Sequence, residues 1–143
     1  MPHLLFLLFL GLVAVPPSGA VAPGTFTLTG EMSSARSLHT ATLLGDGRVL
    51  VCGGADATLQ ALSTAEIYDP RTATFSPTGT MGTARFAANA TLLPDGRVLI
   101  VGGEDSGNVS TTSVELFNPA TGTFSLTGSL LISRLNPTVT LLG

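Results

Sequence analysis

Lysine is missing from the 143-residue sequence, and only 10% of the residues are charged. All six basic residues are arginines, which stand apart from one another at positions 36, 48, 71, 85, 97 and 134. A protein that binds nucleic acid neutralises phosphates with a stripe or patch of basic side chains. Because this chain has no such stripe and carries a net charge of −3, we expect no nucleic-acid partner.

Cysteine is nearly absent as well, since Cys52 is the single example. One cysteine cannot form a disulfide within the molecule, so packing must stabilise the fold. In the repeat described below, Val101 takes the place of Cys52, and a valine can be neither a nucleophile nor a metal ligand. We therefore interpret Cys52 as a small buried hydrophobic side chain.

The motifs of several enzyme classes are also missing. The sequence contains no Gly-x-Ser-x-Gly motif, no phosphate-binding loop and no His-Glu-x-x-His motif. We therefore predict no catalytic residue, no metal ligand and no cofactor, and we favour a protein that is not an enzyme.

Long hydrophobic runs are limited to residues 4–15, which Pro16 and Pro17 bring to an end. This run is shorter than the roughly 20 residues that cross a bilayer. It has the length of a signal-peptide core, and small residues for cleavage follow as Ser18 with Ala20 or Ala20 with Ala22. Cleavage after Ala20 is preferred, because Pro23 would follow the other site. We predict a signal peptide over residues 1–20 and a mature chain that is secreted or periplasmic, without stable membrane insertion. An uncleaved anchor and a misassigned start codon are the alternatives, because no basic residue precedes the run.

An internal repeat dominates the rest of the sequence. The stretch "GDGRVLVCGG" at residues 45–54 returns as "PDGRVLIVGG" at residues 94–103. Residues 31–79 align with residues 80–128 without a gap, giving 23 identities in 49 positions. The motif at 73–79 also occurs at 122–128 and at 24–30. We therefore expect the last strand of one unit at 24–30, whole units at 31–79 and 80–128, and the start of another at 129–143.

Each repeat has the pattern of four short strands. Residues 39–44 and 48–52 are rich in aliphatic and β-branched side chains, and Asp46-Gly47 between them favours a tight hairpin. Residues 65–70 ("AEIYDP") and 73–79 ("ATFSPTG") follow as a third and a fourth strand. The sequence therefore predicts a small antiparallel sheet in each repeat.

The second strand, "RVLVC" or "RVLIV", is apolar on both faces, so each sheet must be covered on both sides. Sheets that recur at a fixed period and stack on their neighbours are the blades of a β-propeller. A parallel β-helix is the alternative, but it has shorter coils and needs no hairpin in each repeat. We predict an all-β propeller fragment with two complete four-stranded antiparallel blades and a partial blade at each end.

These motifs together resemble the kelch repeat, whose period is about 50 residues. The resemblance rests on a strand that ends in a glycine pair (Gly53 and Gly54, Gly102 and Gly103), on "EIYDP" and "ELFNP", and on "MSSAR" and "MGTAR". The sequence of the first two strands, "HTATLLGDGRVLVCGG", is similar to the kelch-type repeats of galactose-oxidase-like propellers in particular. One departure is phenylalanine in the fourth strand, where many kelch units have tryptophan.

The resemblance implies a ring of six or seven blades, which two blades cannot close. We therefore expect a gene fragment, part of a longer chain, or a chain that closes by further blades or by self-association. The resemblance also implies a copper enzyme as one alternative, because galactose-oxidase-like enzymes hold copper through two tyrosines and two histidines. Here only His39 could be a ligand, since Tyr68 becomes Phe117 in the second repeat and behaves as a packing residue.

Charged residues that recur in each repeat are interpreted as structural. They are Arg36, Arg85 and Arg134, with Glu66 and Glu115. A group that is present in every blade serves the blade, because catalysis needs a site only once. We expect inter-strand or inter-blade ion pairs and hydrogen bonds to the backbone. Because each glutamate precedes the next arginine by nineteen residues, the pairing to test is Glu66 with Arg85.

The loop after the glycine pair differs between the repeats and is the candidate binding region. It reads "ADATLQALS" in the first repeat and "EDSGNVSTT" in the second. Propeller loops of this kind gather at one end of a rigid scaffold and carry binding residues. The polar candidates are Asp56, Glu104, Asp105 and Asn108. The leading hypothesis is a non-catalytic propeller segment that binds a protein or a glycan. The alternatives are a fragment of a copper oxidoreductase with its ligands elsewhere, and a truncated gene product without activity.

Overall fold

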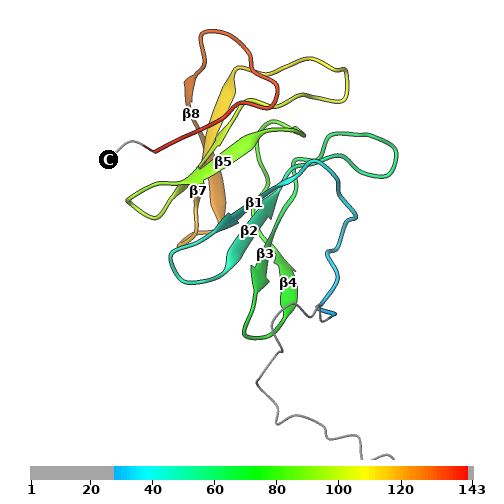
Figure 1. Ribbon diagram of the computed structural model, residues 1–143, viewed down its shortest axis with the longest axis vertical. Coiled ribbons are helices and arrows are strands. Elements are labelled where there is room, and N and C mark those ends of the chain that lie inside the picture. The colour runs from blue at the N-terminus through cyan, green and yellow to red at the C-terminus, as the bar shows by residue number, and fades with distance from the viewer. Residues whose placement is uncertain (1–27, 142–143) are drawn as a thin grey trace, which may run out of the picture.

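The computed structural model describes residues 28–141. Within them the chain forms eight strands and no helix, arranged as two four-stranded antiparallel sheets in the order β1-β2-β3-β4 and β5-β6-β7-β8 (Figure 1). The strands are β1 (Thr40–Leu43), β2 (Val49–Cys52), β3 (Ala65–Asp69), β4 (Thr74–Pro77), β5 (Asn89–Leu92), β6 (Val98–Val101), β7 (Ser113–Asn118) and β8 (Thr123–Ser129). The predicted all-β fold with two antiparallel blades is confirmed. None of the described segments could span a membrane as a helix.

Each Asp-Gly turn closes the first hairpin of its blade. In the first blade Leu43 pairs with Val49, and the amide of Leu44 donates to the carbonyl of Arg48 at 2.8 Å. Gly47 has a φ of 88°, which an L side chain rarely adopts. The second blade repeats this geometry, so the turn sets the register of β1 on β2 and of β5 on β6.

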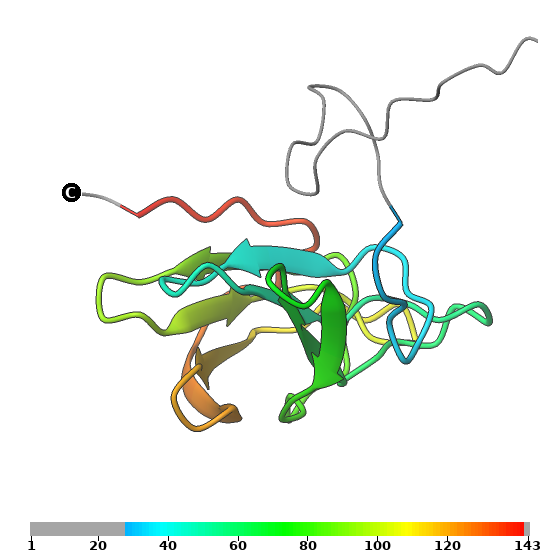
Figure 2. The same ribbon diagram turned by 90° about the horizontal axis from the view of Figure 1, so that it is seen from below.

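The two sheets approach most closely at β1 and β5 and diverge toward β4 and β8 (Figure 2). Between them lies a common core to which the first sheet contributes Leu50, Cys52 and Ala65. Against these pack side chains of the second repeat, namely Met81, Val98, Ile100 and Phe117. Leu50 and Cys52 are two residues apart on β2 and therefore point to the same face. The inner strand is apolar on this face because it covers the neighbouring blade.

Cys52 lies inside this core with an exposed fraction of 2%. Its sulfur is 3.1 Å from Oγ1 of Thr40, and burial raises the pKa of the thiol. A neutral, buried thiol is a weak nucleophile.

We therefore expect Cys52→Val to change the free energy of unfolding by less than about 1 kcal/mol. The reason is that valine already occupies the matching position 101 in the second blade. Urea unfolding of both proteins measures the difference. In the native wild type, a thiol reagent at pH 8 should modify Cys52 only as fast as the chain unfolds. Rapid modification of the folded chain would contradict the buried assignment.

Both ends of the described chain continue the repeat pattern. Gly30 donates its amide to the carbonyl of Ala73 at 2.7 Å, as Gly79 donates to Gly122 at 2.9 Å. No strand is assigned within residues 28–30 or 130–141. The partial blades at 24–30 and 129–143 stay predictions, and the predicted signal peptide at residues 1–20 lies outside the described residues.

Candidate functional site

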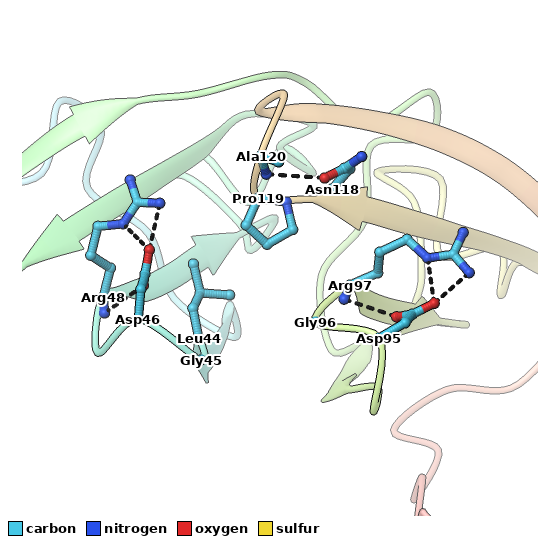
Figure 3. Close-up of a pocket in the computed structure, with 10 residues that line it drawn as sticks. All are labelled: Leu44, Gly45, Asp46, Arg48, Asp95, Gly96, Arg97, Asn118, Pro119 and Ala120. Atoms are coloured by element: carbon cyan, nitrogen blue, oxygen red, sulfur yellow. Dashed lines mark hydrogen bonds and ion pairs between the residues drawn. The ribbon is translucent and has the colours of Figure 1, made fainter.

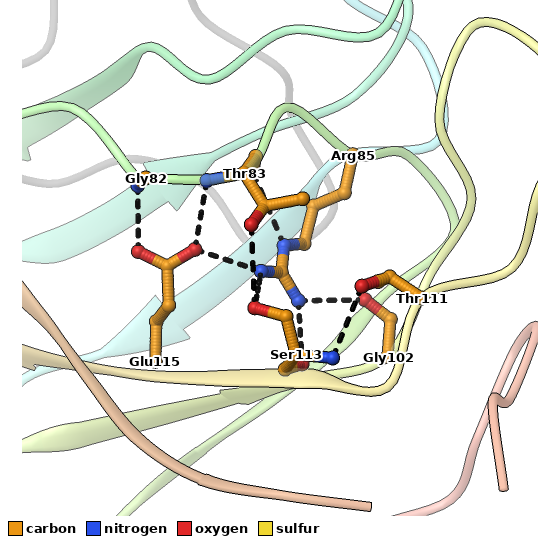
Figure 4. A network of polar contacts seen from close by, with 7 residues as sticks. All are labelled: Gly82, Thr83, Arg85, Gly102, Thr111, Ser113 and Glu115. Atoms are coloured by element: carbon orange, nitrogen blue, oxygen red, sulfur yellow. Dashed lines mark hydrogen bonds and ion pairs between the residues drawn. The ribbon is translucent and has the colours of Figure 1, made fainter.

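A buried network of polar contacts surrounds Arg85 (Figure 4). Its Nη2 atom lies 2.7 Å from Oε1 of Glu115, and both side chains are almost completely buried. Its Nη1 atom donates to the carbonyls of Gly102 and Ser113, each at 2.9 Å. The arginine therefore joins the segment before β5 to the end of β6 and the start of β7.

Glu115 accepts further bonds on the other side of this network. The amides of Gly82 and Thr83 donate to its two carboxylate oxygens at 2.7 and 3.1 Å. Both oxygens of this carboxylate therefore have hydrogen-bond partners within the protein. The network thus fixes the turn at 81–85 against β7.

The first blade repeats the network around Arg36. Nη2 of Arg36 lies 2.8 Å from Oε1 of Glu66, and Nη1 donates to the carbonyls of Gly53 and Thr64. The predicted pairing of Glu66 with Arg85 is therefore wrong. Each arginine pairs with the glutamate thirty residues after it in its own repeat, because Glu66 lies on β3 directly over the turn that precedes β1.

The electrostatics of the pairs follow from their burial. Burial opposes ionisation of Glu66, but hydrogen bonds from Ser33 and the nearby Arg36 outweigh burial and hold the pKa of Glu66 below its usual value. Burial also lowers the pKa of Arg85, while Glu115 opposes that shift. An arginine stays protonated even so. Such pairs orient the chain, since the cost of removing two charges from water offsets much of their attraction.

The glycine pairs make some of the contacts between one repeat and the next. The amide of Gly54 donates to the carbonyl of Arg85 at 2.9 Å, and Gly103 donates to Arg134 at 2.8 Å. Gly53 has a φ of 66°, and a Cβ atom at this position would lie 2.6 Å from the Arg85 carbonyl oxygen. Only glycine permits this approach.

The candidate binding loops lie beyond the glycine pairs. The carboxylate of Asp56 accepts bonds from the amides of Thr58 and Gln60, and Asp105 likewise accepts from Gly107 and Val109. These two aspartates occupy matching positions and close their own loops.

Glu104 and Asn108 have a different setting in the second loop. Glu104 bridges Phe86 and Ser110 through its backbone, and the side chain of Asn108 is exposed on the loop. The loops of neighbouring blades also contact each other, because the amide of Ala61 donates to Oγ of Ser106 at 2.7 Å. The two loops that hold the four candidates are thus in contact with each other.

A shallow pocket of about 350 Å³ lies at the opposite end of the sheets, between the two Asp-Gly turns (Figure 3). Asp46 and Arg48 form one wall as an ion pair at 2.8 Å, and Asp95 and Arg97 form another at 2.7 Å. Each pair also closes its own turn, since the arginine amide donates to the aspartate. The opposite charges of each pair are balanced within its own turn, so the pocket has no excess of charge of either sign.

The candidate ligands His39 and Tyr68 do not fit a copper centre. His39 is exposed and directly precedes Thr40, which pairs with Cys52. This pair lies at the end of the first sheet that is next to Gly53 and Gly54. Tyr68 pairs with Val49 at the other end. The described part of the chain also contains no group of three His, Cys, Asp or Glu side chains that could hold a metal. Metal sites need several ligands that converge on one point.

Tyr68 instead packs against Phe75, with ring centroids 4.8 Å apart. Phe117 and Phe124 make the same contact in the second blade, also at 4.8 Å. The tyrosine is therefore the packing residue that its replacement by Phe117 predicted.

Some members of the network were not predicted from the sequence. Ser33 donates its amide to Glu66, and Oγ of Ser113 accepts a bond from Nη2 of Arg85 at 2.6 Å. A signal was available for Ser113, because a hydroxyl residue, Thr64, stands at its matching position. Glycine stands at the position that matches Ser33, and the amide of Gly82 makes the same bond to Glu115, so the residue type at this position carries no signal.

Comparison with known proteins agrees with this geometry. A family model of the kelch motif matches residues 36–82 and 86–131. No curated protein matches the sequence. Among the 134 matching chains of solved structures is a fungal alcohol oxidase of the AA5 family in complex with copper. That likeness has a TM-score of 0.59 at 23% identity over 69% of this chain.

The chain spans only 23% of the length of that oxidase, and the likeness concerns the fold. The two matches of the family model cover most of both blades, including the glycine pairs, Glu66, Glu115 and Arg36, while Arg85 falls between the two matched ranges. This chain belongs to the kelch-repeat family, as two consecutive blades of a β-propeller.

Proposed function

We propose that this chain is a non-catalytic segment of an exported kelch propeller, which binds a protein or a glycan through loops 55–62 and 104–111. The observation that carries the proposal is the bond between Ala61 and Ser106, which joins the variable loops of two blades into one surface. Large exposed side chains lie on this surface, including Leu59 at 71% and Val109 at 61%. Exposed apolar groups beside polar ones on a rigid scaffold are typical of binding sites.

Photo-crosslinking tests for a protein partner, since the chain has no lysine for amine-reactive reagents. A photo-reactive benzoylphenylalanine replaces Val109 in one variant and the exposed Ala120, at the opposite end of the blade, in the other. We expect extracellular proteins of the source organism to crosslink to position 109 and not to position 120. Equal crosslinking at both positions would count against the loops.

An array of immobilised oligosaccharides tests for a glycan partner. We expect Glu104→Ala to reduce binding by about tenfold or more, as removal of an important contact does. Arg97→Ala, which changes the distant Asp-Gly turn, serves as the control and should bind as the wild type does. The proposal fails if neither the array nor the crosslinking detects a partner.

A second candidate function is part of a copper oxidoreductase. It is supported by the likeness to a copper-bound oxidase, and it needs metal ligands outside this chain because the residues described here do not converge. The genomic sequence beyond Gly143 separates the candidates. Further blades with histidine and tyrosine ligands would favour the oxidoreductase, whereas an immediate stop codon would favour the truncated product without activity.

A further inference from the structure

The sequence contains two Asp-Gly steps, Asp46-Gly47 and Asp95-Gly96. An aspartate before glycine is prone to isomerise, because glycine has no side chain to hinder its own amide nitrogen. That nitrogen attacks Cγ of the protonated carboxyl group, the carboxyl OH and the amide proton leave as water, and a succinimide ring forms. Water then opens the ring at either carbonyl and gives aspartate or isoaspartate. The net change is a rearrangement that needs no other reagent.

Isoaspartate would disrupt the turns in which these residues lie. It routes the main chain through the former side chain and so lengthens the turn by one atom. The present turn closes its hairpin tightly, since the amide of Leu93 donates to the carbonyl of Arg97 at 2.8 Å. Because turn length fixes the register of a hairpin, a longer turn would disturb the pairing of β5 with β6. The same holds for β1 and β2.

Packing does not shield either step. Asp46 and Asp95 are both exposed, so water reaches their carboxyl groups. No atom outside the chain neighbours lies within 4 Å of a Cβ position built on Gly47 or Gly96. Any protection of the aspartates therefore comes from contacts within the turns.

Such contacts involve both reacting groups of the second turn (Figure 3). Oδ1 of Asp95 accepts a bond from the amide of Arg97 at 3.0 Å, while Oδ2 accepts from Nε at 2.8 Å and lies 2.7 Å from Nη2. The bond from the arginine side chain holds the pKa of Asp95 below its usual value, and an ionised carboxylate is a poor target for a nucleophile. The attacking group is also engaged, because the amide of Gly96 donates to the carbonyl of Leu93 at 2.9 Å.

The first turn has the same contacts. Oδ1 of Asp46 accepts from the amide of Arg48 at 3.1 Å, and Oδ2 lies 2.8 Å from both Nε and Nη2. The amide of Gly47 donates to the carbonyl of Leu44 at 3.1 Å. Exposed ion pairs add little to stability, so stability alone does not account for a two-pronged contact that both turns make.

We propose that Asp46 and Asp95 are latent sites of isoaspartate formation, and that Arg48 and Arg97 hold them in the unreactive form. Each arginine keeps the carboxylate ionised and fixes both of its oxygens on the residue after the glycine. The turns lie at the opposite end of the sheets from loops 55–62 and 104–111, so the test is independent of the proposed binding function.

Arg97→Ala tests the proposal, with the first turn as a control inside the same molecule. The purified chain is kept near neutral pH in water enriched in heavy oxygen. An endoprotease that cleaves before aspartate but not before isoaspartate then reports each turn separately by mass spectrometry. We expect isoaspartate at position 95 to form about fivefold faster than in the wild type, the factor that loss of an exposed pair typically allows. Position 46 should keep its wild-type rate, and incorporated heavy oxygen should mark the succinimide route.

Two further variants and an unfolded sample complete the test. Arg48→Ala should give the mirror result, with faster reaction at position 46 alone. Arg97→Lys should fall between wild type and Arg97→Ala, because lysine keeps the charge but lacks the two-pronged geometry. In guanidinium chloride the two positions should react at similar rates in every variant. Equal rates at positions 46 and 95 in folded Arg97→Ala would overturn the proposal, as would a folded wild type that reacts as fast as the unfolded chain.

Discussion

Arg85→Ala is expected to lower the free energy of unfolding by about 3–5 kcal/mol. The substitution leaves the carboxylate of Glu115 buried without its counter-charge, although the amides of Gly82 and Thr83 still bond it. It also removes the donor for the carbonyls of Gly102 and Ser113. Urea unfolding followed by circular dichroism measures the loss.

A double-mutant cycle tests whether the loss arises from the pair. Glu115→Gln and Arg85→Ala should be strongly non-additive, because each removes the partner of the other. Glu66→Gln and Arg85→Ala should instead be additive, since these residues share no hydrogen-bond partner.

Arg97→Ala is the matched control at an exposed pair. Arg97 has a side chain that is 45% exposed and an aspartate partner two residues away. Exposed pairs contribute about 0–1 kcal/mol. If Arg97→Ala cost as much as Arg85→Ala, burial would not be the cause of the expected loss.

The repeat in the sequence does not determine which glutamate pairs with each arginine. Glu66 lies thirty residues after Arg36 and nineteen before Arg85. Both spacings recur with the same period, so the period alone cannot choose between them. The choice depends on how the turn at 33–36 lies over β3, which is a property of the three-dimensional packing. The strands, hairpins and stacked sheets were predictable because local side-chain patterns determine them.

The candidate binding residues show a related limit. Asp56 and Asp105 stand in loops that differ in sequence, yet they occupy matching positions and bond the same relative backbone amides. Their recurrence within variable loops was a signal of a structural task. Glu104 and Asn108 have no such counterparts, because Ala55 and Leu59 stand at the matching positions. Among the four, these two best suit a role in specificity.

Gly53→Ala is expected to lower the free energy of unfolding by about 4 kcal/mol or more, at the upper end for single substitutions. Two costs combine in this variant. A φ of 66° disfavours any Cβ by about 1–2 kcal/mol. The new atom would also lie 2.6 Å from the Arg85 carbonyl oxygen, which is backbone and cannot rotate away. Because that carbonyl belongs to the next blade, the clash opposes the stacking of the two sheets.

Gly47→Ala separates the cost of backbone strain from the cost of the steric clash. Gly47 has a φ of 88°, but no atom outside its chain neighbours lies within 4 Å of the added Cβ position. This variant should therefore lose only the roughly 1–2 kcal/mol of backbone strain. Thermal unfolding of both variants provides the comparison. A soluble Gly47→Ala beside an insoluble or strongly destabilised Gly53→Ala would show that contact between blades requires the glycine pair. Equal losses would mean that the left-handed backbone alone requires it.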